Sequence, residues 1–239
     1  YPNSDWQDAL FQTGWMQNHT ININGGSDKN HYYISGNYMN NPGIMENSGY
    51  ERYSARVNLD AEVKDWFTIG VNAYGTRGKE ELGLLKTESN DNFYTYMQAT
   101  TPGICYQAPD GRYGGVNNSE DDPQSSSNNV LKMLNDVKGN RTTNNIVSRF
   151  YAQLRPFKGL TIEGSYTYAF SDQFLYQQPV FHDLWNLYDN TLQIAGTGVS
   201  KVINRNNKTV RNNMDGLVRY ETDIDRLNIQ ATVGASQEA

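Results

Sequence analysis

The chain has 239 residues and a formal net charge of −6, and 12% of its residues are aromatic although only 19% are charged. A disordered chain would lack these aromatic residues and carry more charge, and no apolar run approaches the roughly 20 residues that a membrane-spanning helix needs. The acidic balance, without a basic patch to neutralise phosphates, also excludes nucleic acid as an expected partner.

Eight stretches of the chain alternate apolar and polar residues, which is the pattern of a β-strand that separates two environments. Strands are therefore expected over residues 18–25, 29–40, 51–62, 66–77, 143–155, 160–172, 211–222 and 226–237. Most exceed the usual length of about 5 to 6 residues, and they match the roughly 9 to 11 residues that a tilted strand needs to cross a bilayer.

The connections between these strands differ in length. Tight turns are expected at residues 26–28, 63–65, 156–159 and 223–225, and the other connections are a short loop at 41–43 and long loops over about 78–141 and 173–210. Short turns at one end and long loops at the other are typical of a transmembrane β-barrel. The expected fold class is therefore all-β, a segment of a transmembrane antiparallel barrel with about eight strands. The alternation by itself also fits a soluble β-sandwich.

The two faces of the expected strands differ in chemistry. The apolar face is expected to meet lipid at Ile21, Val57, Ile69, Ile162 and Ile229. The other face is expected to line a wet lumen, because charges at this density are too costly in a dry core. Its predicted lumen-facing residues are Arg52, Arg56, Asn72, Arg149, Glu163 and Arg219. Aromatic girdles are expected near the strand ends, from Trp66, Phe67, Tyr166, Tyr168 and Phe170.

The connecting segments contain shorter structural signals. A short helix is expected over residues 4–11, with the serine at its start as the candidate N-cap, and two more are expected at residues 91–99 and 129–135. Residues 109–111, with the sequence Pro-Asp-Gly, predict a turn. Residues 191–203 predict a small hairpin above the membrane.

No catalytic or metal-binding constellation stands out in the sequence. The only cysteine, Cys105, excludes an intrachain disulfide framework, and the three histidines are scattered without the spacing of a zinc motif. Nucleophile-elbow and phosphate-loop motifs are also missing. The acidic run at residues 120–122 lacks the spacing of a known calcium loop and is interpreted as solvated charge. We therefore expect no enzymatic activity and no cofactor.

The second long loop is rich in aromatic residues. Its candidate contact residues are Phe174, Tyr176, Phe181, Trp185 and Tyr188. Aromatic faces on exposed loops suit stacking on sugar rings or binding peptide side chains. The alternative is that these rings pack the loop against itself or against a partner.

An ordered series of short segments runs through nearly the whole chain. The segments are Asn3–Asp8, His19–Asn24, Gly25–Asp28, Tyr32–Gly36, Gly43–Ile44, Tyr50–Ser54, Arg56–Asp60, Pro109–Gly114 and Lys158–Leu160. Each segment is weak evidence alone, but their combined order resembles the start of the barrel in the SusC/RagA family of TonB-dependent outer-membrane transporters of Bacteroidetes.

The resemblance implies that residues 1–239 form about eight strands of a 22-stranded barrel, without the plug domain and the remaining strands. It further implies a location in the cell outer membrane and active import of a glycan or a peptide. The partners it implies are a SusD-like surface lipoprotein that acts as a lid, TonB through a region upstream, and outer-membrane lipid. In this setting the aromatic residues of the second long loop are expected to contact the lid or the substrate. Two other readings stay open, namely a passive porin or structural barrel and a soluble carbohydrate-binding β-sandwich.

Overall fold

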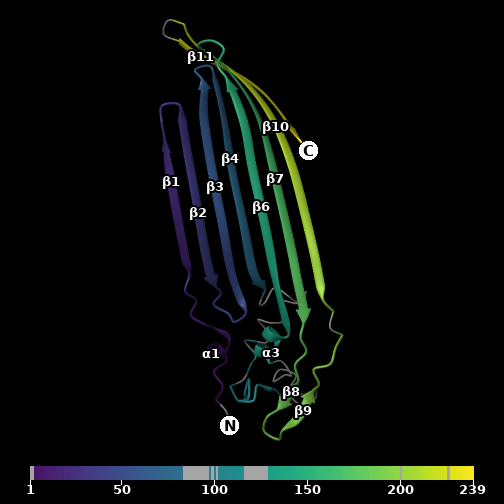
Figure 1. Ribbon diagram of the computed structural model, residues 1–239. Coiled ribbons are helices and arrows are strands. Elements are labelled where there is room, and N and C mark those ends of the chain that lie inside the picture. The colour runs from purple at the N-terminus through teal and green to yellow at the C-terminus, as the bar shows by residue number, and fades with distance from the viewer. Residues whose placement is uncertain are drawn as a thin grey trace.

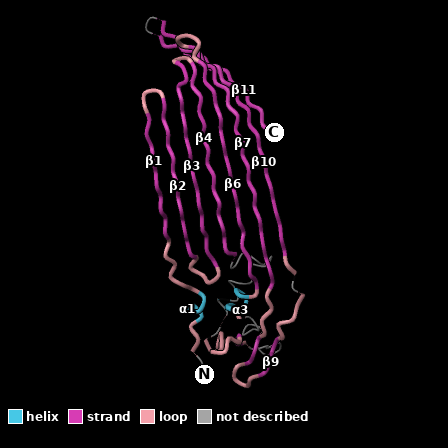
Figure 2. Tube along the Cα trace, in the orientation of Figure 1, coloured by secondary structure: helices cyan, strands magenta, loops and turns pink. Residues whose placement is uncertain are grey.

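The computed structural model describes residues 3–82, 97, 100, 102–115, 129–199, 201–224 and 227–239. Eight long strands lie side by side in one sheet, with tight turns at one end and the loop segments gathered at the other (Figures 1 and 2). The acidic run at residues 120–122 and, except for Met97, the helix expected at 91–99 lie outside the described residues. No helix within the described ranges is both long and apolar enough to cross a membrane.

The sheet is an antiparallel meander in which every strand pairs with the next long strand along the chain. The strands are β1 (Gln17–Gly26), β2 (Asn30–Pro42), β3 (Ser48–Lys64), β4 (Phe67–Leu82), β6 (Val137–Leu154), β7 (Leu160–Pro179), β10 (Ile203–Ile224) and β11 (Leu227–Glu238). All eight expected strands are confirmed, and the sheet is open, with β1 and β11 at its edges. From the β1–β2 turn to the β10–β11 turn, each tight turn lies further from the loop end than the one before it (Figure 1), as tilted strands of a barrel require.

Several strands extend further toward the loop end than the alternation predicts. Strand β7 has 20 residues and β10 has 22. Their pairing begins at the loop end, where Ile203 lies opposite Gln177, and continues without interruption toward the turn end. Polar residues occupy both faces of the outer part of β10, and the outer part of β7 carries Phe174, Leu175 and Tyr176 in succession, so the period of two disappears on both strands although the backbone ladder continues. The eight strands form a single layer, so the alternative of a soluble sandwich with two stacked sheets is wrong for the described chain.

The register separates two faces. Residues paired across neighbouring strands point to the same side of a sheet, so the pairs can be followed from strand to strand. One row runs through Val57, Ala73 and Ser148, and all five positions expected to meet lipid share its side, here called the apolar face. The adjacent row runs through Asn72 and Arg149, and all six residues expected to line the lumen share its side, here called the polar face.

Short elements form a compact cap at the loop end of the sheet (Figure 1). They are α1 (Trp6–Leu10), β5 (Tyr113–Gly114), α3 (Val130–Asn135), β8 (Leu184–Asn186) and β9 (Thr191–Ile194). We call the described residues 3–16, 43–47, 102–115, 129–136 and 180–199 the loop cap. It contains the buried hydrophobic core found in the described chain, made of Trp6, Leu10, Met45, Tyr113, Val130, Leu131, Leu134 and Leu184.

The helices expected at residues 4–11 and 129–135 are confirmed, and two other expectations need correction. Helix α1 is capped by Asp5 rather than by the expected serine, because the Asp5 carboxylate accepts hydrogen bonds from the backbone N–H groups of Gln7 and Asp8. The hairpin expected at residues 191–203 is wrong, since β9 pairs with β8 and Ile203 already begins β10. Fully buried Leu184 explains the shift, because it anchors β8 in the cap core.

Candidate binding surfaces in the loop cap and on the polar face

The two long loops are joined in the cap by backbone pairing. Strand β5 from the first loop lies parallel to β8 from the second, and the N–H of Gly115 donates to the carbonyl of Trp185 at 2.9 Å. The Tyr188 hydroxyl donates to the carbonyl of Gly103 and closes a second link between the same loops. Together the backbone pairing and the Tyr188 bond hold the two loops side by side in the cap.

Asn129 connects three pieces of the cap through one amide group. Its side-chain oxygen accepts from the N–H of Lys132 at 2.9 Å and so caps α3. Its Nδ2 donates to the carbonyl oxygens of Tyr106 and Gly114. With 2% of its surface exposed, Asn129 is the buried polar residue of the described chain, and its loss would leave buried groups without partners.

The end of α3 is tied to the second long loop by an ionic cluster. The Asp136 carboxylate lies 2.6 Å from Nζ of Lys132 and 2.9 Å from Nδ1 of His182. The His182 ring in turn packs edge-on against Tyr113, with the ring centroids 5.1 Å apart. Burial raises the pKa of Tyr113, and the carboxylates of Glu46 and Asp136 add to that effect. The cluster therefore orders the segment that leads from β7 into the second loop.

The structure places the five candidate aromatic residues in two different environments. Phe174 and Tyr176 lie on strand β7, so the expectation that they belong to a loop is wrong. Trp185 lies on β8 with the guanidinium of Arg112 5.0 Å above its ring, and Phe181 and Tyr188 also belong to the cap. Neither a lid nor a substrate contact follows from these positions alone, and that role stays a prediction.

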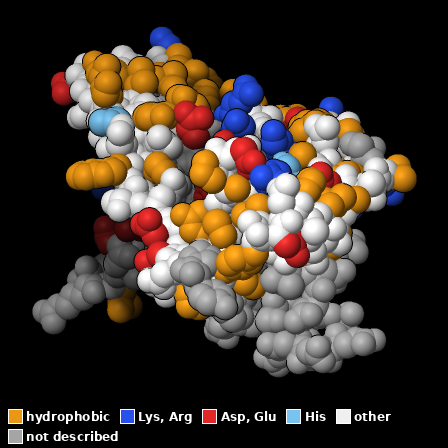
Figure 3. Space-filling model, turned by 90° about the horizontal axis from the view of Figure 1, so that it is seen from below, with side chains coloured by type: hydrophobic (Ala, Val, Ile, Leu, Met, Phe, Trp, Pro, Cys, Tyr) orange, Lys and Arg blue, Asp and Glu red, His pale blue; other side chains and the backbone are white. Residues whose placement is uncertain are grey.

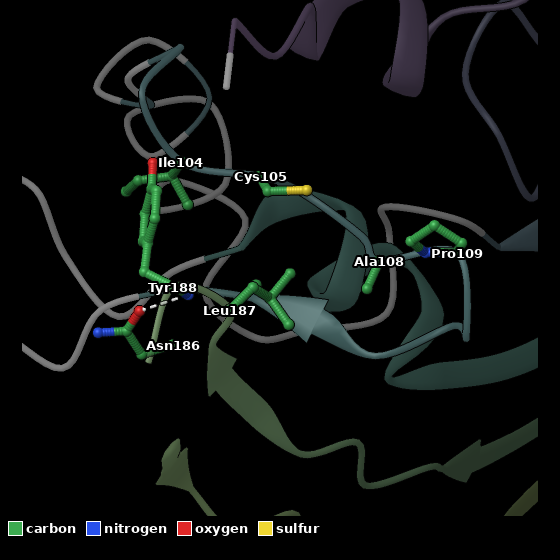
Figure 4. A pocket seen from close by; sticks show the side chains of 9 residues that line it. Ile104, Cys105, Ala108, Pro109, Asn186, Leu187 and Tyr188 are labelled. Atoms are coloured by element: carbon green, nitrogen blue, oxygen red, sulfur yellow. Dashed lines mark hydrogen bonds between the residues drawn. The ribbon is translucent and has the colours of Figure 1, made fainter. Parts of the chain in front are cut away.

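A cavity of about 300 Å³ opens between the two long loops. Figure 4 shows its wall, which is built by Ile104, Cys105, Ala108, Pro109, Gly114, Gly115, Asn186, Leu187 and Tyr188. Of the residues singled out from the sequence as candidate contacts, only Tyr188 belongs to this wall. For the other wall residues, the only local sequence signal is the turn expected at residues 109–111. That turn is confirmed, because the N–H of Gly111 donates to the carbonyl of Ala108.

A hydrogen-bonded network crosses the polar face from β3 to β7. The Tyr151 hydroxyl donates to Asp60, and the Arg149 guanidinium lies 5.5 Å from the Tyr151 ring centroid. Arg149 also pairs with Glu163 at 2.8 Å, which brings together two of the predicted lumen residues. The Tyr151 ring covers Gly70 on the intervening strand, where a Cβ atom would lie 2.3 Å from it.

Asn72 lies directly opposite Arg149 of this network, whereas Arg56 and Arg219 lie apart from it on the same face. The Arg56 guanidinium stacks 5.2 Å from the Tyr74 ring centroid, and Arg219 lines a cleft at the turn end. Trp66 lines that cleft too, and its ring stacks on the ring of Phe67 with the centroids 5.8 Å apart, so the two aromatic residues expected in one girdle lie together at the turn end.

At the turn end an ion pair joins two neighbouring turns. Lys29 Nζ lies 2.9 Å from Oδ1 of Asp65. This hydrogen bond raises the pKa of Lys29 and lowers the pKa of Asp65. Both groups are exposed, so the pair contributes little to stability and mainly sets the relative position of the turns.

Figure 3 looks at the molecule from the loop end. Acidic and basic side chains lie next to one another in one zone, and hydrophobic side chains gather in patches around it.

Comparisons with known proteins fit this architecture. No family model matches the chain. One TonB-dependent receptor of Formosa agariphila is 30% identical over 175 residues, which is 72% of this chain and 17% of the receptor. A second from the same organism is 29% identical over 238 residues, covering 99% of this chain and 22% of the receptor. The TonB-dependent receptor SusC of Bacteroides thetaiotaomicron is 29% identical over 153 residues, covering 56% of this chain and 15% of SusC.

Solved structures show the same fold. The RagAB peptide importer in its closed-closed state aligns with a TM-score of 0.73 at 17% identity, covering 100% of this chain and 28% of that one. The ferric preacinetobactin receptor BauA of Acinetobacter baumannii aligns with a TM-score of 0.52 at 10% identity, covering 94% of this chain and 29% of that one. The chain thus spans roughly a fifth to a quarter of the proteins it matches, and its open sheet is an arc of their barrel.

Proposed function

We propose that this chain, a relative of the SusC/RagA type of TonB-dependent receptors, forms part of the wall and outer cap of an active importer in the outer membrane. The observation that carries the proposal is the sheet itself. One of its faces is apolar across its central part, the other is polar, and no second layer in the described chain covers either face.

The length of the apolar stretch supports a membrane setting. On β7 the apolar face runs from Leu160 to Phe170 and is followed on that face by Asp172. On β4 it runs from Phe67 to Gly75 and is followed by Arg77, which lies in the same row as Asp172. These stretches match the roughly 9 to 11 residues that a tilted strand places in the bilayer.

The exposure of the apolar face supports the same setting. Ile21 is 72% exposed, Leu227 is 66% exposed and Val233 is 74% exposed, and all three lie on the apolar face. Soluble proteins rarely expose contiguous apolar patches beyond a few hundred Å². Lipid chains would cover these side chains without a protein partner, while the polar face would line the lumen.

The finer proposal concerns energy, partner and cargo. The polar face would guide a nutrient, either an oligosaccharide or a peptide, through the lumen, and import would draw energy from the proton gradient through TonB. The loop cap would stand at the outer mouth, where a SusD-like lipoprotein would act as a lid. Trp185 and Tyr188 are the aromatic side chains of the cap that we expect to contribute to lid or substrate binding.

The function is tested by uptake measurements with the full-length protein in cells. We expect uptake of the nutrient to stop when the proton gradient is collapsed or when TonB is deleted, because passive diffusion cannot concentrate a solute. Uptake that continues unchanged in both cases would favour the second candidate, a passive porin.

The role of the cap aromatics is tested by Trp185→Ala and Tyr188→Ala in the same protein. We expect each to weaken lid association or nutrient uptake, since aromatic residues buried in interfaces often cost about 2 kcal/mol or more when truncated. Ile44→Ala, at an exposed position of the cap, is the control. A lower melting temperature with unchanged association and uptake would show that these rings only pack the cap.

A further inference from the structure

The cavity in the loop cap has a predominantly apolar wall. Ile104, Ala108, Pro109 and Leu187 contribute aliphatic groups from both long loops, and the Tyr188 side chain stands beside Ile104 (Figure 4). Its volume of about 300 Å³ lies at the lower end of the range for ligand sites, which is about 300–1,000 Å³. The space therefore suits one compact group rather than a whole oligomer.

The polar side chains of the wall are already engaged inside the protein. The Asn186 side-chain oxygen accepts from the N–H of Tyr188 at 3.0 Å, and its Nδ2 donates to Asp189 at 3.2 Å. The Tyr188 hydroxyl is used in the bond to Gly103, which links the two loops. The Tyr188 oxygen can still accept one bond and Nδ2 of Asn186 has a second hydrogen, so the side chains of the wall offer a ligand few polar partners.

Three backbone groups of the two glycines in the wall are engaged as well. The N–H of Gly114 donates to Tyr106 and the N–H of Gly115 donates to Trp185, while the carbonyl of Gly114 accepts from Asn129. The bare glycines are also required for this packing, because a Cβ at Gly114 would lie 1.9 Å from a backbone oxygen. The wall therefore offers close apolar contact and few free hydrogen-bonding partners.

We propose that this cavity receives an apolar side chain of an imported peptide, which assigns the cargo to peptides rather than oligosaccharides. The proposal rests on the import function proposed above. A sugar ring buried here would lose the hydration of its many hydroxyl groups and gain few partners in return, and that imbalance opposes binding. A leucine or phenylalanine side chain loses nothing of this kind and gains the burial of its apolar surface.

Cys105 provides a probe because its thiol lies in the cavity wall and donates only a weak bond, at 3.3 Å, to the carbonyl of Gln107. The experiment measures the rate at which iodoacetamide alkylates Cys105 in the purified full-length transporter, by mass spectrometry of the fragment that contains it. Three additives are compared, namely a hexapeptide containing leucine and phenylalanine, the same peptide with serine at those positions, and maltohexaose.

We expect the apolar peptide to slow alkylation by about tenfold or more, as for a site occupied most of the time. The serine peptide and maltohexaose should leave the rate unchanged. Equal protection by maltohexaose or by the serine peptide would overturn the proposal. Protection by the lid lipoprotein without any peptide would also overturn it, because the occupant would then be the partner.

A variant that fills the space gives a second test. Ala108→Phe should weaken binding of the apolar peptide by about tenfold or more, whereas Ala195→Phe, in the cap but outside the cavity wall, should not. Equal binding by the two variants would contradict the proposal. If the protein takes up an oligosaccharide in a proton-driven way and peptides do not protect Cys105, this inference is refuted and the import function stands. If uptake does not depend on the proton gradient, the import function itself is refuted.

Discussion

Gly70 allows one tyrosine to bridge three strands of the polar face. The Tyr151 ring starts on β6, lies across Gly70 on β4 and reaches Asp60 on β3. Aromatic rings that cover glycines in this way compensate for the side chain that the glycine lacks. Together with the pair of Arg149 and Glu163, this contact ties neighbouring strands by side chains where no second layer supports them.

Gly70→Ala should break this arrangement. The new methyl group would lie 2.3 Å from the Tyr151 ring, so the ring must leave and its bond to Asp60 is lost. We expect the full-length protein to lose about 1–3 kcal/mol of unfolding free energy in denaturant titrations, as for other overpacked sites. Gly216→Ala is the matched control, because nothing lies within 4 Å of a Cβ there, and it should change stability by less than about 0.5 kcal/mol. Equal effects of the two substitutions would show that the ring contact is unimportant.

Asn129→Ala should loosen the loop cap. The change removes the cap of α3 and the amide that donates to the carbonyls of Tyr106 and Gly114, and the Tyr106 carbonyl then keeps only its 3.2 Å bond from the N–H of Gly114. The expected local cost is about 1–3 kcal/mol. Amide hydrogen exchange at Met133 in the full-length protein measures this cost. Asn129→Asp keeps the acceptor for α3 but loses the donors, so the local stability of α3 in this variant should lie between that of Asn129→Ala and that of the wild type. Asp5→Ala is the control, because it removes only an exposed cap from α1. If Asp5→Ala destabilises α1 as much as Asn129→Ala destabilises α3, the central role of Asn129 is refuted.

At the scale of elements, the long strands have two parts with different roles, an inner part of membrane-crossing length and an outer part that carries the loop cap. The inner part of each long strand alternates apolar and polar residues over a membrane-sized distance. The outer part of β10 is polar on both faces, and the outer part of β7 mixes polar residues with Phe174, Leu175 and Tyr176. A strand that continues past the apolar stretch lifts the loop cap away from the membrane surface. The loops therefore meet each other and the medium rather than lipid.

The two faces make a direct prediction for neighbouring positions on β3. Val57→Arg places a charge on the apolar face and should destabilise the protein in a bilayer by about 2–4 kcal/mol if the site is near the midplane. Asn58→Arg, one residue further along the same strand, places the charge on the polar face and should cost much less. Folding of the full-length variants into lipid vesicles measures the difference. Equal costs would mean that the two faces do not meet different environments.

For the whole molecule, the sequence predicts the sheet well because the two environments impose a period of two on every strand inside them. Val57 and Arg56 therefore reveal their faces without any structure. The outer extension of β10 carries no such signal, since both of its faces are polar, and only the backbone pairing with β7 shows it.

The loop cap could not be predicted in the same way. Ile104 and Leu187 share a cavity wall although a long stretch of sequence separates them, and the parallel pairing of β5 with β8 brings them together. Neither short strand has a detectable pattern. The sequence marks Trp185 and Tyr188 as unusual loop residues. It does not predict which residues surround them, because those residues come from the other long loop.

The central claim is that this sheet stands in a membrane with its apolar face toward lipid. The most direct measurement is cysteine labelling of the full-length protein in membranes, with a reagent confined to the bilayer and a second one confined to water. Single cysteines would replace Val57 and Ile162 on the apolar face and Arg56 and Arg219 on the polar face. The account predicts bilayer labelling at the first pair and aqueous labelling at the second, and preferential bilayer labelling at positions 56 and 219 would contradict it.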